Sequence, residues 1–183
     1  MDKIPPWVQQ VINTQKKESH NNYSRWVQFS TIGIDNSPRV RTVVFRGWNK
    51  DYEIEILTDK RSEKFKEIEM NNKVEICWLF HESKCQFRFR GVSKIDEGND
   101  ALAHWENLSP NAKSLWAWPQ PGDIYEKESF FSKEIPDQAP KLNNFILIKI
   151  VVNQVEQLLL QKPVHIRRRW LRNSDWTEER INP

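Results

Sequence analysis

The sequence has few cysteines, few glycines and no long apolar run. Its 183 residues include two cysteines and five glycines. Cys77 and Cys85 are too few for a disulfide framework and lack the spacing of metal ligands, so we expect no metal site. No run is long enough for a transmembrane helix, and residues 1–6 lack the apolar segment of a signal peptide. We therefore expect a reduced, cytoplasmic protein that has no membrane partner.

An excess of charge of one sign is also missing. The chain has 28 basic and 25 acidic side chains, which gives a formal net charge of +3. This balance does not indicate a nucleic-acid partner. The basic, tryptophan-flanked segment 167–172 is expected to stack its guanidinium groups on tryptophans within the fold.

Aromatic residues and short β-rich segments are abundant, with nine tryptophans and nine phenylalanines. Alternation of apolar and polar residues predicts strands, which we place at 26–33, 41–46, 52–58, 74–80, 85–92, 145–152 and 155–160, with a last hairpin over 165–183. Helical spacing predicts helices, which we place after Pro5, from Ser62, in two pieces over 96–118, and at 125–133.

These elements favour a mainly β protein, a β-barrel with helices around it. The length and the absence of a linker indicate a single domain over 1–183. A barrel of this size has little interior space, so we expect a ligand on its outside or at a subunit contact.

The strongest functional signal lies in residues 38–64. Arg41 and Arg46 stand on a predicted strand, and Ser62 and Lys64 stand at the start of the helix that follows the next strand. A helix N-terminus has unpaired N–H groups and a partial positive charge, and an arginine can bind an anion through two hydrogen bonds. The segment therefore predicts an anion site, for which phosphate is the simplest ligand.

An explanation without a ligand is also open. Ser62 would then be an N-cap, and Arg61 and Lys64 would form a solvated helix start. Arg41 and Arg46 are five residues apart, so an ideal strand would place them on opposite faces. The residues alone do not decide between the two explanations.

The same residues, in the same order, resemble the pyridoxamine 5′-phosphate oxidase family. The resemblance covers roughly residues 26–95 and 145–183. The matching positions are Arg41 to Arg46, Leu57-Thr58, Ser62-Glu63-Lys64, Gln86, Arg169-Trp170 and the terminal Arg180-Ile-Asn-Pro. It implies an FMN-binding split barrel that forms a homodimer with FMN at the subunit interface.

The resemblance also implies roles for single residues. It places Arg41, Ser62 and Lys64 at the FMN phosphate, and Arg46 and Gln86 near the flavin ring. Further flavin contacts are implied for Thr58, for the backbone of Thr42 and Val43, and for Arg169, which would reach the flavin of the partner chain. His165 and Arg167 match residues that face the substrate and are the candidates for a catalytic role.

Departures from the family pattern concern the substrate. The family's Tyr, Arg and Ser, which hold the substrate phosphate, fall here on about Ala103, Asn107 and Asn111. None of these carries a positive charge. Near the FMN phosphate, Glu63 replaces an arginine, for which Arg61 is a possible substitute.

Four functions are compatible with this pattern. We favour an FMN-dependent oxidoreductase with a small-molecule substrate other than pyridoxamine phosphate. The first alternative is a non-catalytic flavin-binding protein for storage, sensing or scaffolding. A true pyridoxamine phosphate oxidase, and a family member that binds haem or deazaflavin in place of FMN, are the other two.

Overall fold

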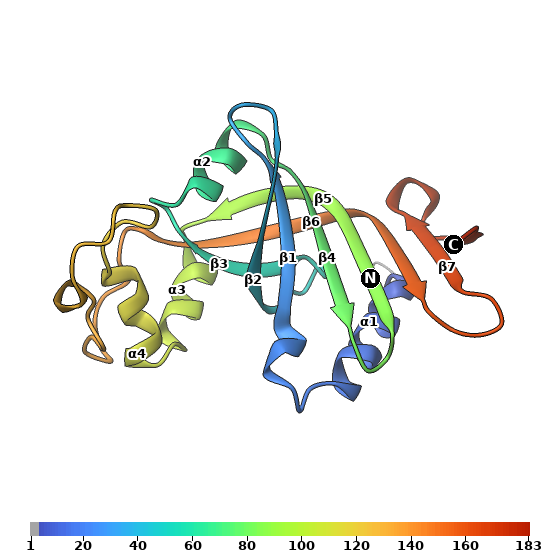
Figure 1. Ribbon diagram of the computed structural model, residues 1–183, viewed down its shortest axis with the longest axis horizontal. Coiled ribbons are helices and arrows are strands. Elements are labelled where there is room, and N and C mark those ends of the chain that lie inside the picture. Colours follow the sequence, from blue (N-terminus) through green and yellow to red (C-terminus); the bar gives the residue numbers. More distant parts are fainter. Residues whose placement is uncertain (1–3) are drawn as a thin grey trace.

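A computed structural model describes residues 4–183, and eight β-strands form the main part of these residues (Figure 1). Neighbouring strands pair antiparallel in the order β3-β2-β1-β4-β5-β6-β7-β8. The strands are β1 (Trp26–Ile32), β2 (Pro38–Trp48), β3 (Ile54–Asp59), β4 (Lys73–Phe80), β5 (Cys85–Asp96), β6 (Phe145–Leu159), β7 (Ile166–Leu171) and β8 (Glu178–Ile181).

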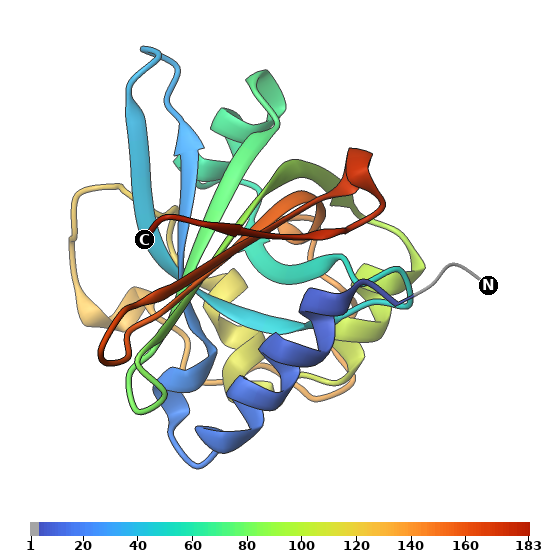
Figure 2. The ribbon, with the colours of Figure 1, turned by 90° about the vertical axis from the view of Figure 1, so that its right-hand side faces the viewer.

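An additional pairing between β3 and β6 closes strands β1 to β6 into a barrel. β7 and β8 extend the sheet beyond the barrel as a hairpin (Figures 1 and 2). The predicted mainly β barrel with helices is therefore confirmed.

β6 makes this closure possible because it is a single strand of 15 residues. Its first half pairs with β3 and with the end of β5, and its second half pairs with the start of β5 and with β7. The sequence placed β structure at 145–152 and, continuing from it, at 155–160. The structure joins both parts through the exposed Asn153 into one strand.

Four α-helices and four short 3₁₀ helices occur in the described residues. The α-helices are α1 (Pro6–Lys17), α2 (Glu63–Met70), α3 (Asn99–Glu106) and α4 (Pro110–Lys113). The 3₁₀ helices are η1 (Asn22–Arg25), η2 (Ser114–Ala117), η3 (Glu128–Phe130) and η4 (Arg172–Ser174). The helix predicted over 125–133 is wrong, because only η3 forms in that segment.

The main core fills the barrel and includes one face of α1. Trp7 of α1 is fully buried, and its ring centroid lies 5.8 Å from those of Trp48 and Phe89 and 5.7 Å from that of Trp176. The apolar stripe of α1 thus joins β2, β5 and the residues before β8. Burial of large aromatic rings contributes most to the stability of such a core.

A second core lies between α3, η2 and the outer side of β3 and β6. Trp105 and Trp116 pack on Phe145, with ring centroids 5.1 and 4.7 Å from it. The Trp116 ring also donates a hydrogen bond of 2.9 Å to the carbonyl oxygen of Thr58. This core therefore fixes the end of β3.

β2 and β3 separate shortly after they pair. Their register begins at Trp48↔Ile54 and ends at Phe45↔Ile56, whereas β3 continues to pair with β6 as far as Asp59. The first part of β2, up to Val44, pairs with β1 on its other edge. Residues 38–44 of β2 therefore have one backbone edge without a strand partner among the described residues. This edge lies on the side of β3.

Two register shifts of the sheet lie next to glycines. β5 shifts against β6 at Gly91, and β2 shifts against β3 at Gly47. A Cβ on Gly91 would lie 2.1 Å from the carbonyl oxygen of Val151, whereas a Cβ on Gly47 would have no neighbour nearer than 3.7 Å. Gly91 is thus required by a close approach of backbone to backbone.

We expect Gly91→Ala to lower the free energy of unfolding by about 3 kcal/mol, because the backbone of β6 must move to admit the methyl group. Gly47→Ala is the matched control and should change it by less than about 1 kcal/mol. Urea denaturation followed by tryptophan fluorescence measures both. Equal effects of the two substitutions would contradict this account of the shift.

Candidate functional site

Four of the predicted cofactor residues meet where β2 and β3 separate. Arg41 comes from β2, Thr58 from the end of β3, Ser62 from the position before α2, and Lys64 from its first turn. The hydroxyl oxygens of Thr58 and Ser62 lie 3.4 Å apart. The structure therefore brings the three residues that the sequence assigned to a phosphate, Arg41, Ser62 and Lys64, together with Thr58, for which another flavin contact was predicted.

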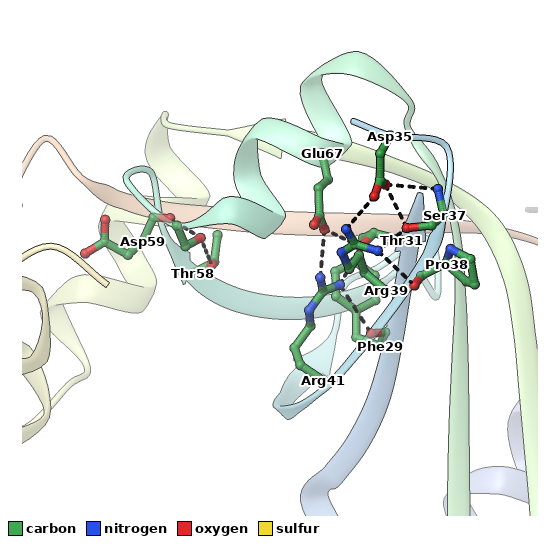
Figure 3. A network of polar contacts seen from close by, with 11 residues as sticks. Phe29, Thr31, Asp35, Ser37, Pro38, Arg39, Arg41, Thr58, Asp59 and Glu67 are labelled. Carbon is green, nitrogen blue, oxygen red and sulfur yellow. Dashed lines mark hydrogen bonds and ion pairs between the residues drawn. The ribbon is translucent and has the colours of Figure 1, made fainter. Parts of the chain in front are cut away.

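Arg41 is held from two sides (Figure 3). Its Nη2 donates a hydrogen bond of 2.7 Å to the carboxylate of Glu67 on α2. Its Nη1 donates to the hydroxyl of Thr31 and to the carbonyl oxygen of Phe29 on β1. These contacts fix the guanidinium plane between β1 and α2.

Lys64 has a different environment from Arg41. Burial, together with the positive charge of Arg41, lowers the pKa of its ammonium group, although Asp59 and Glu67 act in the opposite direction. No hydrogen bond or ion pair of this ammonium group is present among residues 4–183. A partly buried cation without a partner is costly, and an anion would remove that cost.

Ser62 stands at the N-cap position of α2, but its side chain does not cap the helix. Its hydroxyl instead donates a hydrogen bond of 2.7 Å to the carbonyl oxygen of Asp59. The first N–H groups of a helix have no acceptor within the helix. The start of α2 therefore keeps free donors beside Lys64.

Arg61 is not free to act as an additional phosphate ligand. Its guanidinium group binds the carboxylate of Asp59 through Nε and Nη2, at 3.0 and 2.7 Å. Asp59 also accepts a hydrogen bond from Asn144, and despite burial these hydrogen bonds keep its pKa below the ordinary value. Arg61 thus joins the end of β3 to the segment around Trp116, whose carbonyl oxygen it also contacts.

Arg46 lies apart from Arg41, as the five-residue spacing predicts. It stands at the register shift of β2, and burial, followed by the charge of Arg25, lowers its pKa. Its Nε is buried and has no hydrogen-bond partner among the described residues. The side chain of Thr42 is exposed, and that of Val43 packs against the main core. At the edge of β2 that faces β3, these two residues therefore present their backbone groups.

A second group of predicted residues lies on β5 and β7. Gln86 and Arg167 line a cavity of about 130 Å³, together with Arg88 and Glu156. Glu156 is only 7% exposed, and it binds Arg167 at 2.7 Å. The charge of Arg167 is therefore compensated within the chain.

The remaining candidates follow on or just before β7. Arg169 binds Glu179 of β8 at 2.6 Å. His165 is exposed, and its Nδ1 lies 3.1 Å from the carbonyl oxygen of Gln161. Among residues 4–183, no hydrogen bond or ion pair connects this second group to the residues around α2. Most of the predicted residues thus lie in two separate groups, and Arg46 belongs to neither of them.

Sequence reasoning missed Glu67, Thr31 and the contact of Trp116 with Thr58. A glutamate within a helix is usually solvated, yet Glu67 stands between the core residues Phe65 and Ile68, and this position on the apolar face was the available signal. Thr31 lies on the inward face of β1, where alternation with Val27 and Phe29 could have revealed it. Nothing local indicated the contact of Trp116 with Thr58, 58 residues away.

Comparison with known proteins gives one family. The sequence model of the pyridoxamine 5′-phosphate oxidase FMN-binding domain matches residues 4–96. This chain belongs to that family. The resemblance seen in the sequence and the FMN cofactor that it implies are thereby confirmed.

Two relatives resemble the chain over nearly its whole length, and a third, more distant protein shares its fold. The Arabidopsis thaliana protein named pyridoxine/pyridoxamine 5′-phosphate oxidase 2 is 29% identical over 98% of both chains. A solved pyridoxamine 5′-phosphate oxidase-related, FMN-binding protein from Nostoc punctiforme superposes with a TM-score of 0.91 at 29% identity, over 99% of this chain and 100% of its own. PhzG of Burkholderia lata shares the fold at 15% identity, with a TM-score of 0.85 over 98% of this chain and 92% of its own.

The residues around α2 fit the phosphate of the family's cofactor. Lys64 supplies a cation without a hydrogen-bond or ion-pair partner among residues 4–183, the start of α2 supplies N–H groups, and Arg41 lies close to Lys64. The unpartnered Nε of Arg46 gives a further donor on β2.

We expect Lys64→Met to stabilise the flavin-free protein and to weaken FMN binding. The pKa of Lys64 is lowered in the folded state, so its charge opposes folding at neutral pH, and stability rises as pH increases through the folded pKa. The substitution should raise the melting temperature of the flavin-free protein by a few degrees. FMN should bind at least about tenfold more weakly, because one charge-assisted contact is lost.

Lys66→Met is the matched control, since Lys66 is exposed on the same helix. Fluorescence titration with FMN and thermal denaturation without flavin give the two readouts. FMN affinity that is unchanged in Lys64→Met would contradict this placement of the phosphate.

Proposed function

We propose that the chain is an FMN-dependent oxidoreductase that acts on a small molecule other than pyridoxamine 5′-phosphate. The observation that carries this proposal is a contrast between two parts of the structure. Residues suited to the cofactor phosphate gather at α2, whereas the described part of the chain has no cluster of free cations at the positions that the family resemblance assigns to the substrate phosphate.

The cofactor phosphate would be held by Arg41, Lys64 and Ser62 with the first N–H groups of α2. Thr58 stands beside Ser62, and the free edge of β2 offers the backbone of Thr42 and Val43. The named side chains and the backbone N–H groups can donate hydrogen bonds, whereas the backbone carbonyls of Thr42 and Val43 can only accept them. Donors and cations at a dianion provide most of the binding energy for a phosphate.

FMN supplies the chemistry of accepting and returning an electron pair, so the protein needs no nucleophile of its own. Arg46 and Gln86 would lie at the flavin ring, where donors and positive charge stabilise negative charge that develops on reduction. Among the described residues, the buried Nε of Arg46 has no hydrogen-bond partner and can therefore donate a hydrogen bond to a ligand. His165 and Arg167 would face the substrate.

The region of the family's substrate phosphate is acidic here. A cleft of about 520 Å³ lies between α3 and the β2–β3 turn, with Ala103 and Asn107 on its wall. The charged residues that line it are Asp51, Glu53, Glu55 and Asp100, against Lys50 and Lys149. Lys149 is bound to Asp96 and Asp100 at 2.6 and 2.5 Å, so its charge is already compensated. A phosphate dianion would meet net negative charge in this cleft.

The names of the relatives favour a competing function. The Arabidopsis protein that is 29% identical is named an oxidase of pyridoxine and pyridoxamine 5′-phosphate. Against it stand Asn107 and Asn111, which are exposed and uncharged, and Arg167, which is bound to Glu156. These contacts support a different substrate, and turnover with the phosphorylated vitamin decides between the two functions.

We expect negligible oxidation of pyridoxamine 5′-phosphate by protein fully loaded with FMN. The missing cation should remove about 2 kcal/mol or more of substrate binding. Oxygen consumption under air measures turnover, and Asn107→Arg should raise it by restoring a cation beside the cleft. A kcat/KM of about 10⁴ M⁻¹s⁻¹ or higher in the unmodified protein would contradict the proposal.

A non-catalytic flavin protein is the remaining alternative. It would bind FMN with the same residues but would not pass electrons to a substrate. Anaerobic reduction of the bound flavin by reduced nicotinamides or candidate substrates distinguishes it, because a storage or scaffold protein should show no saturable reduction.

Our proposal includes a homodimer with FMN at the subunit interface. Two separate groups of cofactor candidates on one chain are expected if each FMN contacts both subunits. The outer face of adjacent strands also exposes Trp26 by 54%, Val40 by 69% and Leu79 by 39%. Gln86 is paired with Leu79 and thus borders these apolar residues. A second copy of the chain would cover them.

A mixed dimer tests this arrangement. Arg41→Ala and Arg169→Ala should each weaken FMN binding when present in both subunits. In a dimer of one variant with the other, one site carries both substitutions and the second site carries neither, if Arg169 reaches the partner's flavin. We therefore expect roughly one tightly bound FMN per mixed dimer. Absence of any restored site, or a monomer that binds FMN tightly in sedimentation, would contradict the arrangement.

A further inference from the structure

Glu67 is a buried acid in the middle of the predicted phosphate site. Its side chain is 5% exposed and stands on the same face of α2 as Lys64 and Ile68. The carboxylate binds Arg41 at 2.7 Å and accepts a hydrogen bond from the hydroxyl of Thr31 (Figure 3). A buried carboxylate is costly without such partners, so these contacts explain how it is tolerated.

These contacts determine where Arg41 can point. Three of the five N–H groups of its guanidinium group donate hydrogen bonds, to Glu67, Thr31 and the carbonyl oxygen of Phe29. The Nε–H and the second N–H of Nη2 make no hydrogen bond among the described residues and remain available to a ligand. Because a guanidinium group is planar and its donors are fixed relative to one another, three contacts leave little freedom of orientation.

The same carboxylate also changes the charge of the site. Arg41 and Lys64 would together present two positive charges to a phosphate, and Glu67 cancels one of them. Its charge lies close enough to affect the ammonium group of Lys64, whose pKa it shifts upward against the effect of burial. At the effective dielectric of a protein site, a carboxylate several ångströms from a dianion repels it by more than the thermal energy.

We propose that Glu67 is a positioning residue of the cofactor-phosphate site, which orients Arg41 and limits the affinity for FMN. The inference rests on the proposed location of the FMN phosphate at α2. It assigns two opposed effects to one side chain: the hydrogen bond to Arg41 favours phosphate binding, and the negative charge opposes it. The cofactor would consequently be held less tightly than by the same site without this charge.

Glu67→Gln separates the two effects, because the amide retains an oxygen acceptor for Arg41 and Thr31 but carries no charge. FMN should bind about tenfold more tightly to the flavin-free variant than to the unmodified protein. Riboflavin, which lacks the phosphate, should bind with an affinity within about twofold of the original. Glu67→Ala removes the acceptor as well, so it should bind FMN more weakly than Glu67→Gln.

Glu69→Gln is the matched control, since Glu69 loses the same charge from the exposed face of the same helix. Its FMN affinity should change by less than about twofold. Titration of flavin fluorescence with FMN and with riboflavin gives all the affinities, and urea denaturation without flavin confirms that each variant is folded.

A merely structural role of Glu67 would change the affinities for FMN and riboflavin in parallel. Parallel changes, no change, or weaker FMN binding in Glu67→Gln would therefore overturn the inference. Glu67→Gln alone keeps the test decisive if Glu67→Ala does not fold. Failure of the location itself is distinguishable, because Arg41→Ala and Lys64→Met would then leave FMN binding unchanged.

Discussion

The site depends on a difference between the two edges of β3, which pair with their neighbouring strands over different lengths. One edge pairs with β6 over the full length from Ile54 to Asp59, which closes the barrel. The other edge pairs with β2 only as far as Phe45↔Ile56. The remaining part of β2, residues 38–44, pairs with β1 only, so its backbone diverges from the end of β3. The helix α2 begins shortly after this end of β3. A continuous β2–β3 ladder would satisfy these backbone groups and leave no position for a ligand between them.

Compensation of charge is the second constraint on the site. Arg61, Arg167 and Arg169 each bind a carboxylate of their own chain at 2.7 Å or less. Each of these arginines therefore acts first as a connection between elements of the fold. Lys64 has no such carboxylate partner among residues 4–183, and Arg46 keeps an unpartnered Nε. Of the cations predicted to bind the cofactor, these two have no carboxylate partner among the described residues.

The strands were predictable because one face of each is buried, which gives the alternation along β1, β4 and β5. The positions of Arg41, Ser62 and Lys64 suggested an anion site, and the family resemblance rather than these residues alone favoured it over a solvated helix start. Register shifts at Gly47 and Gly91 and the burial of Glu67 were not predictable, since each depends on a partner distant in sequence. Arg61 illustrates the difference: its basic character suggested a phosphate ligand, but Asp59, two residues earlier, takes its guanidinium group.

Two residues proposed to bind the cofactor are held by contacts with other elements of the fold, whereas the residues at the positions of the family's substrate phosphate lie on the surface. Thr58 is fixed by Trp116 of the second core, and Arg41 is fixed by β1 and α2, so changes to either of these two residues would disturb contacts between elements of the fold. Asn107 and Asn111 are exposed, and their replacement by other residues would disturb no core contact. Surface positions of this kind can change with little effect on stability. A likeness to the family therefore transfers to the flavin site more securely than to the substrate, because folding constrains the first and not the second.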